Sequence, residues 1–517
     1  MKLSVRIMPV HCVLVASALW SADAGASNRG PDFDNDDKDD IALGVFHEDI
    51  GTTGGTQAGA VHILYGGSAT GLHDKASRLS SIYRSVSGVE GDIADFGGFG
   101  HTLAWGDFDG DCFDDLVVGD TDEAIQVFYG SSTGLSTADD EIFQFFLGGH
   151  FEALAAGDFN GDGFDDIAAG NPEWDDSGAV LILYGSVDGL DTSAGPSGMQ
   201  VLDHVELGLV SHNVTAPDFA KALAAGDFNC DGVDDLAIGA QHEHSSAMTT
   251  DAAGAVYVVY GQFDDPLGSS TVQTWRQGSN SVKETPESFD EFGWSLAVGN
   301  FNGDTSPASG LVCHDLAIGA WGEDLSATDA GLVHVLYGQP GTGLQATSPD
   351  DQVWHRDDPN ILGTPNLTDI FGYAIVAGNL DGDNFEELII GVPNDSSVTV
   401  IRGSSTGLVN TNDLMWTQAT TNVPGDEALG ETFGGCLTYG QRWHPDTDSG
   451  VAVCNPSKTV DEVSNAGMLH ALYINNEFIE AFSAGWEQSD IDASLIEEYD
   501  QFPTTTAAPR DRPFTCD

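Results

Sequence analysis

Aspartates occupy alternate positions of a nine-residue segment that starts at Asp107. The segment reads DFDGDCFDD, and the apolar run LVVG follows it directly. In a hairpin of this length, the side chains at positions 1, 3, 5 and 9 and the carbonyl oxygen of position 7 can converge on one point, as they do in other calcium loops. These groups belong to Asp107, Asp109, Asp111, Phe113 (carbonyl oxygen) and Asp115.

A cation is needed to hold such a group of carboxylates together. Four carboxylates within a few ångströms repel one another strongly. No histidine or cysteine stands at a ligand position, which disfavours zinc and copper, whereas a shell of oxygen atoms suits Ca²⁺. We therefore expect calcium as the cofactor of this segment.

Related segments begin at residues 32, 158, 227, 300 and 379. The same positions give as predicted ligands Asp32, Asp34, Asp36, Lys38, Asp40; Asp158, Asn160, Asp162, Phe164, Asp166; Asp227, Asn229, Asp231, Val233, Asp235; and Asn379, Asp381, Asp383, Phe385, Glu387. The segment at 300 offers Asn300, Asn302 and Asp304 before an insertion, so we expect about five sites and leave a sixth open. One alternative stays open for every segment, because Asp, Asn and Gly are also common turn formers.

The segments belong to a longer repeat with consistent flanks. A Phe-Gly pair and a short apolar run precede them, as in FGHTLAWG from Phe99, and a run such as AGAVHILYGG from Ala58 follows. A Trp-containing run, such as TWRQ from Thr274, often comes next. Four short strands separated by Gly-rich turns describe one blade of a β-propeller. With a vestigial seventh copy near residue 441, the repeat predicts an all-β, seven-bladed ring.

The repeat resembles the FG-GAP repeat of the integrin α-subunit N-terminal propeller. The resemblance rests on Phe-Gly, then D-x-D-x-D-G-x-x-D, then Gly-Ala-Pro or variants such as Gly170-Asn171-Pro172. It implies a propeller with calcium loops that recognises a ligand on one face. The chain departs from the pattern at Ala220, which replaces a glycine, at Asn300, and in the seventh copy, which lacks an acidic loop.

Composition and the first residues indicate an exported protein. The 82 acidic residues outnumber the 16 basic ones and give a net charge of −66, which argues against a nucleic-acid partner. Residues 1–24 resemble a cleaved signal peptide, with Lys2 and Arg6 before an apolar stretch. We expect the propeller over 25–506, a tail over 507–517, no membrane span, and a secreted, cell-surface or periplasmic monomeric glycoprotein. Six cysteines outside the leader favour disulfides, and the predicted pair is Cys436–Cys454.

Several catalytic or metal motifs have simpler explanations within the repeat. GSSTG at Gly130 and at Gly403 matches a nucleophile elbow, but it stands where other blades have a hairpin turn. His242-Glu243-His244 offers metal ligands without a third partner in sequence, so exposed loop histidines are the favoured interpretation. Glu48, Glu243 and Glu323 follow equivalent strands, and they form either a rim on one face or plain surface.

Three functions remain open from the sequence. The favoured one is an adhesion or ligand-recognition module for a protein or glycan, with no catalytic residues. The first alternative is an extracellular hydrolase, because FG-GAP propellers also accompany phospholipase D-type enzymes. The second is a carbohydrate-binding lectin, for which Trp275, Trp354 and Trp416 could stack on sugars, although strand packing is the favoured role of these tryptophans.

The two ends of the chain are expected to complete one blade. The first acidic segment begins at Asp32 without the Phe-Gly run that precedes the others, and Tyr499-Asp500-Gln501-Phe502 resembles Phe289-Asp290-Glu291-Phe292 before the fifth segment. We therefore expect residues 495–506 beside residues 32–45, an arrangement that leaves no open sheet edge.

Overall fold

A computed structural model describes the chain from residue 30 to 486, together with residues 505–506. The gaps in this range are 51–56, 69–70, 74–77, 85, 87, 92–96, 123, 139, 146–147, 210–217, 245–249, 270–271, 426–430, 445–446, 448, 459–466, 476–477 and 481–482. The predicted signal peptide, the 507–517 tail and Tyr499–Phe502 lie outside the described residues.

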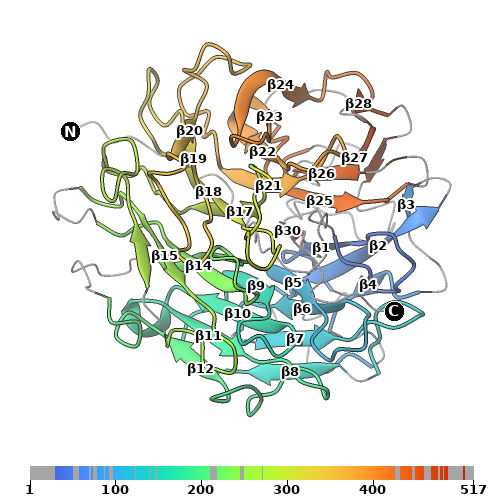
Figure 1. The fold of residues 1–517 in the computed structure, drawn as a ribbon. Helices are drawn as coiled ribbons and strands as arrows, with labels where there is room; N and C mark the ends of the chain where they lie inside the picture. The colour runs from blue at the N-terminus through green and yellow to red at the C-terminus, as the bar shows by residue number, and fades with distance from the viewer. Residues whose placement is uncertain are drawn as a thin grey trace, which may run out of the picture.

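The described strands form seven antiparallel sheets arranged as the blades of a ring (Figure 1). Blade 1 has β1 (Ile41–Val45), β2 (Ala60–Ser68), β3 (Gly71–His73), β4 (Ser81–Ile82) and β30 (Thr505–Thr506). Blades 2 and 3 have β5 (Thr102–Gly106), β6 (Asp115–Gly119), β7 (Ala124–Phe128), β8 (Glu141–Gln144); and β9 (Ala153–Gly157), β10 (Asp166–Asn171), β11 (Ala179–Leu183), β12 (Gln200–Leu202). Blades 4 and 5 have β13 (Phe219–Gly226), β14 (Asp235–Ala240), β15 (Ala255–Val259), β16 (Gln273–Trp275); and β17 (Ser295–Gly299), β18 (Asp315–Ala320), β19 (Leu332–Leu336), β20 (Gln352–Trp354). Blades 6 and 7 have β21 (Ala374–Gly378), β22 (Glu387–Val392), β23 (Ser397–Arg402), β24 (Val409–Thr417); and β25 (Leu437–Gln441), β26 (Ser449–Asn455), β27 (Met468–Asn475), β28 (Phe478–Ile479), β29 (Ala484–Trp486).

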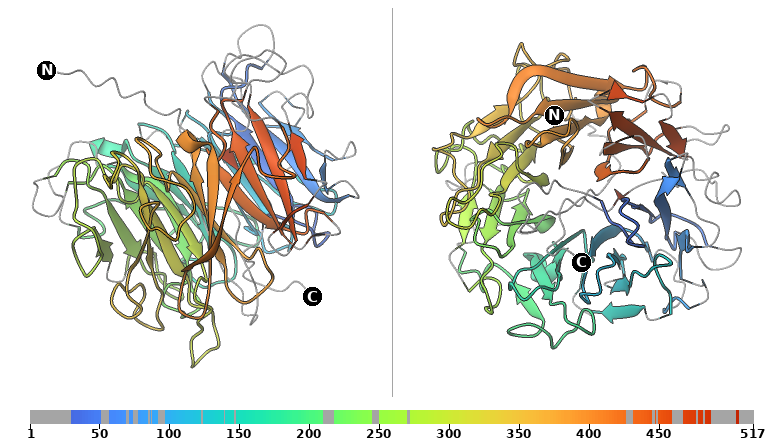
Figure 2. Two further views of the ribbon diagram at one scale, coloured as in Figure 1. Left: turned by 90° about the horizontal axis from the view of Figure 1, so that it is seen from above. Right: turned by 45° about the vertical axis from the view of Figure 1, so that its right-hand side comes forward.

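This architecture is a seven-bladed β-propeller, as the repeat predicts. The first strand of each repeat lies toward the centre of the ring and later strands lie outward, which Figure 1 shows for β17, β21 and β25. Seen from the side, the blades stand next to one another in a disc (Figure 2). Two short 3-10 helices, η1 (Trp174–Asp176) and η2 (Pro393–Asp395), follow the second strands of blades 3 and 6. Within the described ranges, we find no helix with the length and apolar character needed to cross a membrane.

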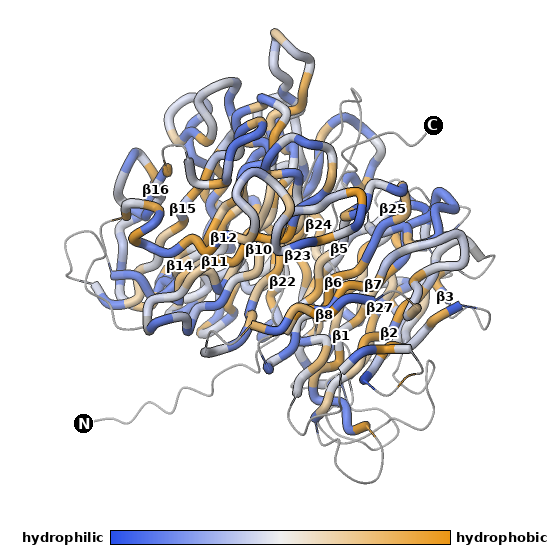
Figure 3. Tube along the Cα trace, turned by 90° about the horizontal axis from the view of Figure 1, so that it is seen from below, coloured by the Kyte–Doolittle hydropathy of each residue, from blue (hydrophilic) through white to orange (hydrophobic). Residues whose placement is uncertain are grey.

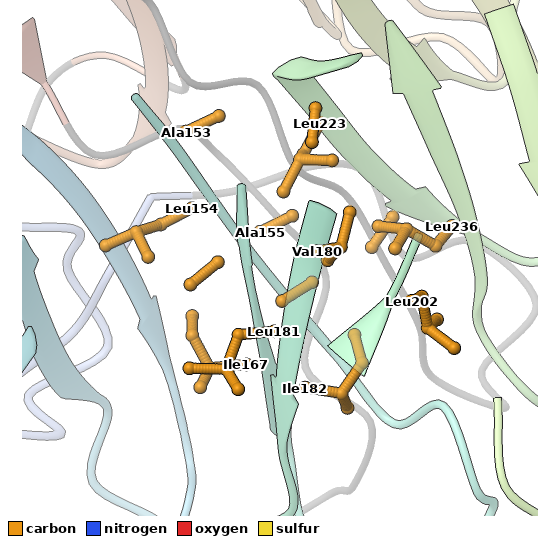
Figure 4. Close-up of a cluster of buried hydrophobic side chains, with 14 of the residues drawn as sticks. Ala153, Leu154, Ala155, Ile167, Val180, Leu181, Ile182, Leu202, Leu223 and Leu236 are labelled. Carbon is orange, nitrogen blue, oxygen red and sulfur yellow. The ribbon is translucent and has the colours of Figure 1, made fainter. Parts of the chain in front are cut away.

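Small and branched apolar residues make the inner strands suitable for burial on both faces. The runs ALAAG in β9 and DLAIGA in β14 and β18 are buried at every position. Apolar segments therefore occupy the strands, and polar segments gather in the loops (Figure 3). Residues of neighbouring blades share one core, in which Val180 and Leu202 of blade 3 pack in a cluster with Leu223 and Leu236 of blade 4 (Figure 4). Such burial of apolar surface supplies the main stabilisation of the ring.

The ends of the chain meet in blade 1. Thr506 and Thr505 of β30 pair with Leu43 and Gly44 of β1, so a C-terminal strand extends the sheet that the first strands begin. The strands of blade 7 lie beside those of blade 1 in Figure 1. This pairing supports the expected closure for the two described residues of the C-terminal segment.

Two disulfides are described, and one was predicted. Cys436 pairs with Cys454 within blade 7, which confirms the prediction. The other joins Cys230 in the acidic loop of blade 4 to Cys313 in the insertion of blade 5, across 83 residues. Cys112, in the acidic loop of blade 2, is also disulfide-bonded.

Candidate functional site

The acidic segments are the loops between the first and second strands of blades 2 to 6, and in blade 1 the equivalent segment directly precedes β1. We number these loops by their blade: loop 1 (32–40), loop 2 (107–115), loop 3 (158–166), loop 4 (227–235), loop 5 (300–315) and loop 6 (379–387). The strand that follows each loop begins near position 9 of that loop, so the apolar run starts where the acidic loop ends. Loops 2 to 6 join equivalent strands and loop 1 contacts loop 2 through the Asp32 amide and Asp114, so all six lie at the same end of the ring.

Aspartate and asparagine side chains of each loop accept hydrogen bonds from the backbone of the same loop. In loop 3, Asp158 Oδ1 accepts hydrogen bonds from the amides of Gly161 and Asp162, at 2.7 and 3.1 Å, and Asp158 Oδ2 accepts one from Gly163 at 2.9 Å. Asp162 Oδ1 in turn accepts one from the amide of Phe164 at 3.1 Å. The turn-forming role of these residues is therefore real, and it aims their carboxylates toward the inside of the loop.

Positions 4 and 6 of loops 1 to 4, and position 4 of loops 5 and 6, have left-handed backbone. In loop 2, these positions are Gly110, with φ of 73°, and Cys112, with φ of 76°. Glycine reaches this region without steric cost, which explains its frequency in the repeat.

Two loops bring three carboxylates together. Asp32, Asp34 and Asp36 in loop 1 each offer an oxygen atom within 4.8 Å of the others. Asp107, Asp109 and Asp115 do so in loop 2. Loops 3 and 4 have an asparagine at position 3, and loop 6 has one at position 1. These amides replace a carboxylate oxygen with a neutral one, which is also a calcium ligand in other proteins.

The loop carboxylates are held in an unfavourable electrostatic environment. Burial raises the pKa of Asp107 to about 7, and the nearby Asp165 and Asp114 add to this shift. Burial likewise raises the pKa of Asp158 to about 7 and that of Asp227 to about 8. A carboxylate whose pKa is raised in this way gains from a bound cation, because the cation stabilises the charged form.

Basic side chains form ion pairs with the aspartates of loops 1 and 6. In loop 1, Arg78 pairs with Asp34, and Lys38 Nζ lies 3.4 Å from Asp36 Oδ1. In loop 6, Arg402 Nη1 lies 3.7 Å from Asp381 Oδ2. These cations offset part of the negative charge in loops 1 and 6, so the loops differ in how strongly they would attract a metal ion.

The acid at position 9 braces the loop to its own blade. In loop 2, Asp115 Oδ2 accepts a hydrogen bond from the Phe108 amide at 2.9 Å, and Oδ1 accepts one from the Gly130 amide at 2.8 Å. The equivalent residues Asp40, Asp166, Asp235 and Asp315 accept the same pair of backbone hydrogen bonds. Position 9 is thus buried in a backbone cradle, and this structural role is additional to the ligand role predicted from the sequence.

The acid at position 8 joins one blade to the next, a role that the sequence analysis missed. Asp165 Oδ2 of blade 3 accepts a hydrogen bond from the Asp107 amide of blade 2 at 2.8 Å, and the Asp165 amide donates to the Asp107 carbonyl at 3.1 Å. Asp114, Asp234 and Glu386 make the same two-way contact with the preceding loops. The signal in the sequence was the first acid of each DD or EE pair, which the odd-position pattern does not explain.

Loop 5 is held differently because of its insertion. His314 takes position 8, and its amide donates to the Asp227 carbonyl of loop 4 at 3.1 Å. The Cys230–Cys313 disulfide then links the same two loops covalently. Asp304 accepts a hydrogen bond from Gln339 Nε2 at 3.3 Å. The insertion therefore preserves the contact between blades 4 and 5, and a calcium site at Asn300, Asn302 and Asp304 stays a prediction.

The starts of the innermost strands form the opposite end of the ring. The residues that follow the Phe-Gly position here are His101, Glu152, Lys221, Trp294 and Tyr373. Trp294 packs against Trp321, with ring centroids 5.5 Å apart, and against Tyr373 at 5.4 Å. The residue types at this end therefore differ from blade to blade, whereas similar acidic loops occur in blades 1 to 6 at the other end.

The other motifs have structural roles. GSSTG is a tight turn in which Ser131 Oγ donates to the Gly134 carbonyl at 2.7 Å, and Ser404 does the same with Gly407. His242 pairs with Asp218 at 2.8 Å. Trp275, Trp354 and Trp416 are buried on outer strands, as the packing interpretation expects.

The rim acids Glu48, Glu243 and Glu323 are buried, so the plain-surface interpretation is wrong. The clearest case is Glu243, whose carboxylate accepts hydrogen bonds from Tyr257 and Arg276, each at 2.8 Å.

Comparison with known proteins identifies the repeat. The FG-GAP repeat model matches residues 151–183, 219–259 and 371–409. Together with the seven sheets, these matches confirm the class: the chain is a β-propeller protein that carries FG-GAP repeats and resembles integrin α subunits.

The relatives are longer proteins of two kinds, phospholipases D and integrin α subunits. The chain is 29% identical over 221 residues to phosphatidylinositol-glycan-specific phospholipase D of Bos taurus. This match covers 41% of this chain and 24% of the relative. It is 25% identical over 244 residues to integrin alpha ina-1 of Caenorhabditis elegans, which covers 46% and 19%. The rat phospholipase D is 30% identical over 258 residues, which covers 49% and 27%. The matches therefore span about a quarter or less of these relatives' length.

Proposed function

We propose that the protein is an exported binding module whose propeller is stabilised by calcium in the acidic loops. The observation that carries the calcium proposal is the convergence of Asp107, Asp109 and Asp115 within 4.8 Å, with the pKa of Asp107 raised to about 7. Oxygen ligands at this spacing suit Ca²⁺. Loops 2, 3 and 4 should bind most tightly, because arginine side chains offset charge in loops 1 and 6.

A loop variant tests calcium binding at one site. Asp109→Asn keeps the oxygen that accepts the Asp111 amide hydrogen bond, so it preserves the turn while it removes a charge. We expect calorimetric titration to show the loss or weakening of one calcium equivalent. Asp188→Asn, in an exposed turn outside the loops, is the matched control. Equal calcium titrations of the wild type and the Asp109 variant would contradict a site in loop 2.

We further propose that the end of the ring opposite the loops binds a protein or glycan ligand. The support is an aromatic group in which Trp294 and Tyr373 precede the inner strands β17 and β21, Trp321 follows β18, and Trp294 is only partly buried. Aromatic faces that remain accessible are favourable contacts for proteins and sugars. Similarity to integrin α subunits supports a recognition role.

Binding to a glycan array and to immobilised extracellular-matrix proteins tests this second proposal. Trp294→Ala should lower binding of any ligand found, whereas Trp486→Ala on β29 of blade 7 should not. Glycan binding would identify a lectin. Turnover of ester or phosphodiester substrates would instead identify a hydrolase, and binding unaffected by Trp294→Ala would contradict the proposed surface.

A further inference from the structure

Two histidines and a glutamate from neighbouring blades meet at the end of the ring opposite the calcium loops. His101 precedes β5 of blade 2, and His150 and Glu152 precede β9 of blade 3. One possible ligand atom from each residue lies within 4.8 Å of the others. The imidazole rings of His101 and His150 are 5.4 Å apart at an angle of 80°.

A hydrogen bond from His101 Nδ1 and an ion-pair contact at His150 Nδ1 orient the two imidazoles as metal ligands are oriented. His101 Nδ1 lies 3.2 Å from the Phe151 carbonyl, which can only accept, so Nδ1 donates and Nε2 is left as the metal-binding nitrogen. His150 Nδ1 lies 3.5 Å from Glu173 Oε2, and His150 Nε2 lies 2.8 Å from Glu152 Oε1. An oxygen atom thus faces Nδ1 of each histidine, which is the usual outer contact of a metal-bound imidazole.

We propose that His101, His150 and Glu152 form a binding site for a transition-metal dication of the Zn²⁺ class. Two imidazoles and a carboxylate favour such an ion over Ca²⁺, which prefers oxygen atoms. Ligand atoms around a tetrahedral zinc ion are about 3.3 Å apart. Metal binding would therefore separate His150 Nε2 and Glu152 Oε1, now 2.8 Å apart, slightly, and would need only small adjustments among ligand atoms that already lie within 4.8 Å of one another. Three protein ligands leave a fourth position open for water or an acidic ligand. This inference does not depend on the proposed ligand-binding function.

The burial of the cluster separates it from ordinary surface acids. His101 is 6% exposed and Glu152 is 9% exposed. A chain with 82 acidic residues will also bind zinc weakly at its surface, so zinc binding by itself is not evidence for this site. The test therefore depends on variants and on a signal that reports nitrogen ligands.

Cobalt spectroscopy and zinc titration of the full chain in calcium-containing buffer provide this test. Co²⁺ bound by two imidazoles and a carboxylate should give stronger visible absorption than Co²⁺ in water, and Zn²⁺ should displace it. His150→Ala, at a partly exposed position, should abolish the absorption and weaken zinc binding at this site by more than about 100-fold, because even outer-contact losses cost 10–100-fold.

Two further variants make the result specific. Glu173→Gln, which alters only the contact to His150 Nδ1, should weaken zinc binding by about 10–100-fold without removing a ligand. His242→Ala is the matched control, because His242 is also partly exposed and paired with an aspartate. The proposal would be overturned if the wild type showed no such cobalt absorption. It would also be overturned if the wild type and His150→Ala had the same zinc affinity and the same cobalt spectra.

Discussion

Two adjacent acids end every acidic loop except loop 5, and the two acids bind different neighbours. The acid at position 9 accepts amides of its own blade, and the acid at position 8 accepts an amide of the preceding blade. Both sets are buried, so the high acidic content of the loops has a structural cause that is separate from the proposed metal binding. Single substitutions can separate these roles.

Asp165 tests the role of position 8. Asp165→Ala should lower the free energy of unfolding by about 1–3 kcal/mol, because it leaves the Asp107 amide without its 2.8 Å acceptor in the interior. Asp165→Asn keeps an acceptor oxygen and should cost less. Denaturant unfolding in saturating calcium measures both, and equal losses for the two variants would contradict a hydrogen-bonding role.

Glu323 should make stability depend on pH. Burial raises the pKa of Glu323 to about 8, and nearby Asp290 adds to the shift. Its hydrogen-bond partner is the neutral side chain of Gln277 in blade 4, at 2.7 Å. Between blades 5 and 6, Arg356 takes the position of Gln277 and forms an ion pair with Asp395. The folded protein therefore holds this proton more tightly than the unfolded chain, and stability falls as pH rises from about 4.5 to about 8.

The neutral variant Glu323→Gln should remove this pH-dependent loss. We expect it to match the wild type near pH 5 and to be more stable by about 2–4 kcal/mol near pH 9. Parallel stability curves for the two proteins across this range would show that Glu323 is not the group responsible.

At the scale of the elements, a tyrosine near or just after the end of the third strand reaches the next blade in several blades, whereas blade 6 has Arg402 at this position. Tyr337 of blade 5 donates to Gln352 and accepts the Leu408 amide of blade 6 at 3.1 Å. Equivalent contacts join Tyr184 to Leu267, Tyr260 to Leu344 and Tyr473 to Leu72. A glycine precedes Leu408, Leu344 and Leu72, whereas Pro266 precedes Leu267. Each of these glycines is close to the tyrosine ring, as Gly407 is to Tyr337, and a side chain there would collide with it. This contact explains why YG and GL recur together in the repeat.

Tyr337→Phe tests the contribution of this contact. The variant keeps the packed ring and removes the hydroxyl that binds the Leu408 amide, so we expect a loss of about 1–2 kcal/mol in the free energy of unfolding. Tyr83→Phe, on a half-buried tyrosine outside this set, serves as the control. Comparable effects of the two substitutions would argue against a special role for the inter-blade hydroxyl.

The strands could be predicted well from the sequence because the same pattern of residues occurs several times along the chain. Phe-Gly pairs, acidic loops and apolar runs located the first three strands of most blades, and the short spacing of Cys436 and Cys454 located one disulfide. The Cys230–Cys313 bond was not predictable, because it depends on two loops that lie 83 residues apart in the chain. The cluster of His101, His150 and Glu152 was missed for the same reason, since only the ring brings blades 2 and 3 together.

At the scale of the whole molecule, several contacts close the ring between blades 7 and 1. Thr505–Thr506 pairs with β1, the Tyr473 hydroxyl accepts the Leu72 amide at 2.9 Å, and the Asp39 amide donates to the Gln441 carbonyl at 3.2 Å. The last two contacts repeat those between other blades. The strand pairing with β30 is the additional element that joins the two ends.

Deletion of residues 495–517 should therefore lower the melting temperature by several degrees, because it exposes the edge of β1. Deletion of 507–517 alone is the matched control, since it retains Thr505 and Thr506. Thermal unfolding and light scattering should show a less stable and more aggregation-prone protein only for the longer deletion. Identical behaviour of the two proteins would contradict closure by β30.

Chelation measures most directly whether calcium stabilises the propeller. Thermal unfolding is compared in millimolar Ca²⁺ and in excess EDTA, for the wild type and for a variant with Asp109→Asn, Asp162→Asn and Asp231→Asn. Each occupied site contributes about 2.7 kcal/mol when calcium is a hundredfold above its dissociation constant. We predict a marked fall in the melting temperature of the wild type on chelation and a much smaller change in the variant. A wild-type melting temperature that is the same with and without calcium would contradict a calcium-stabilised ring.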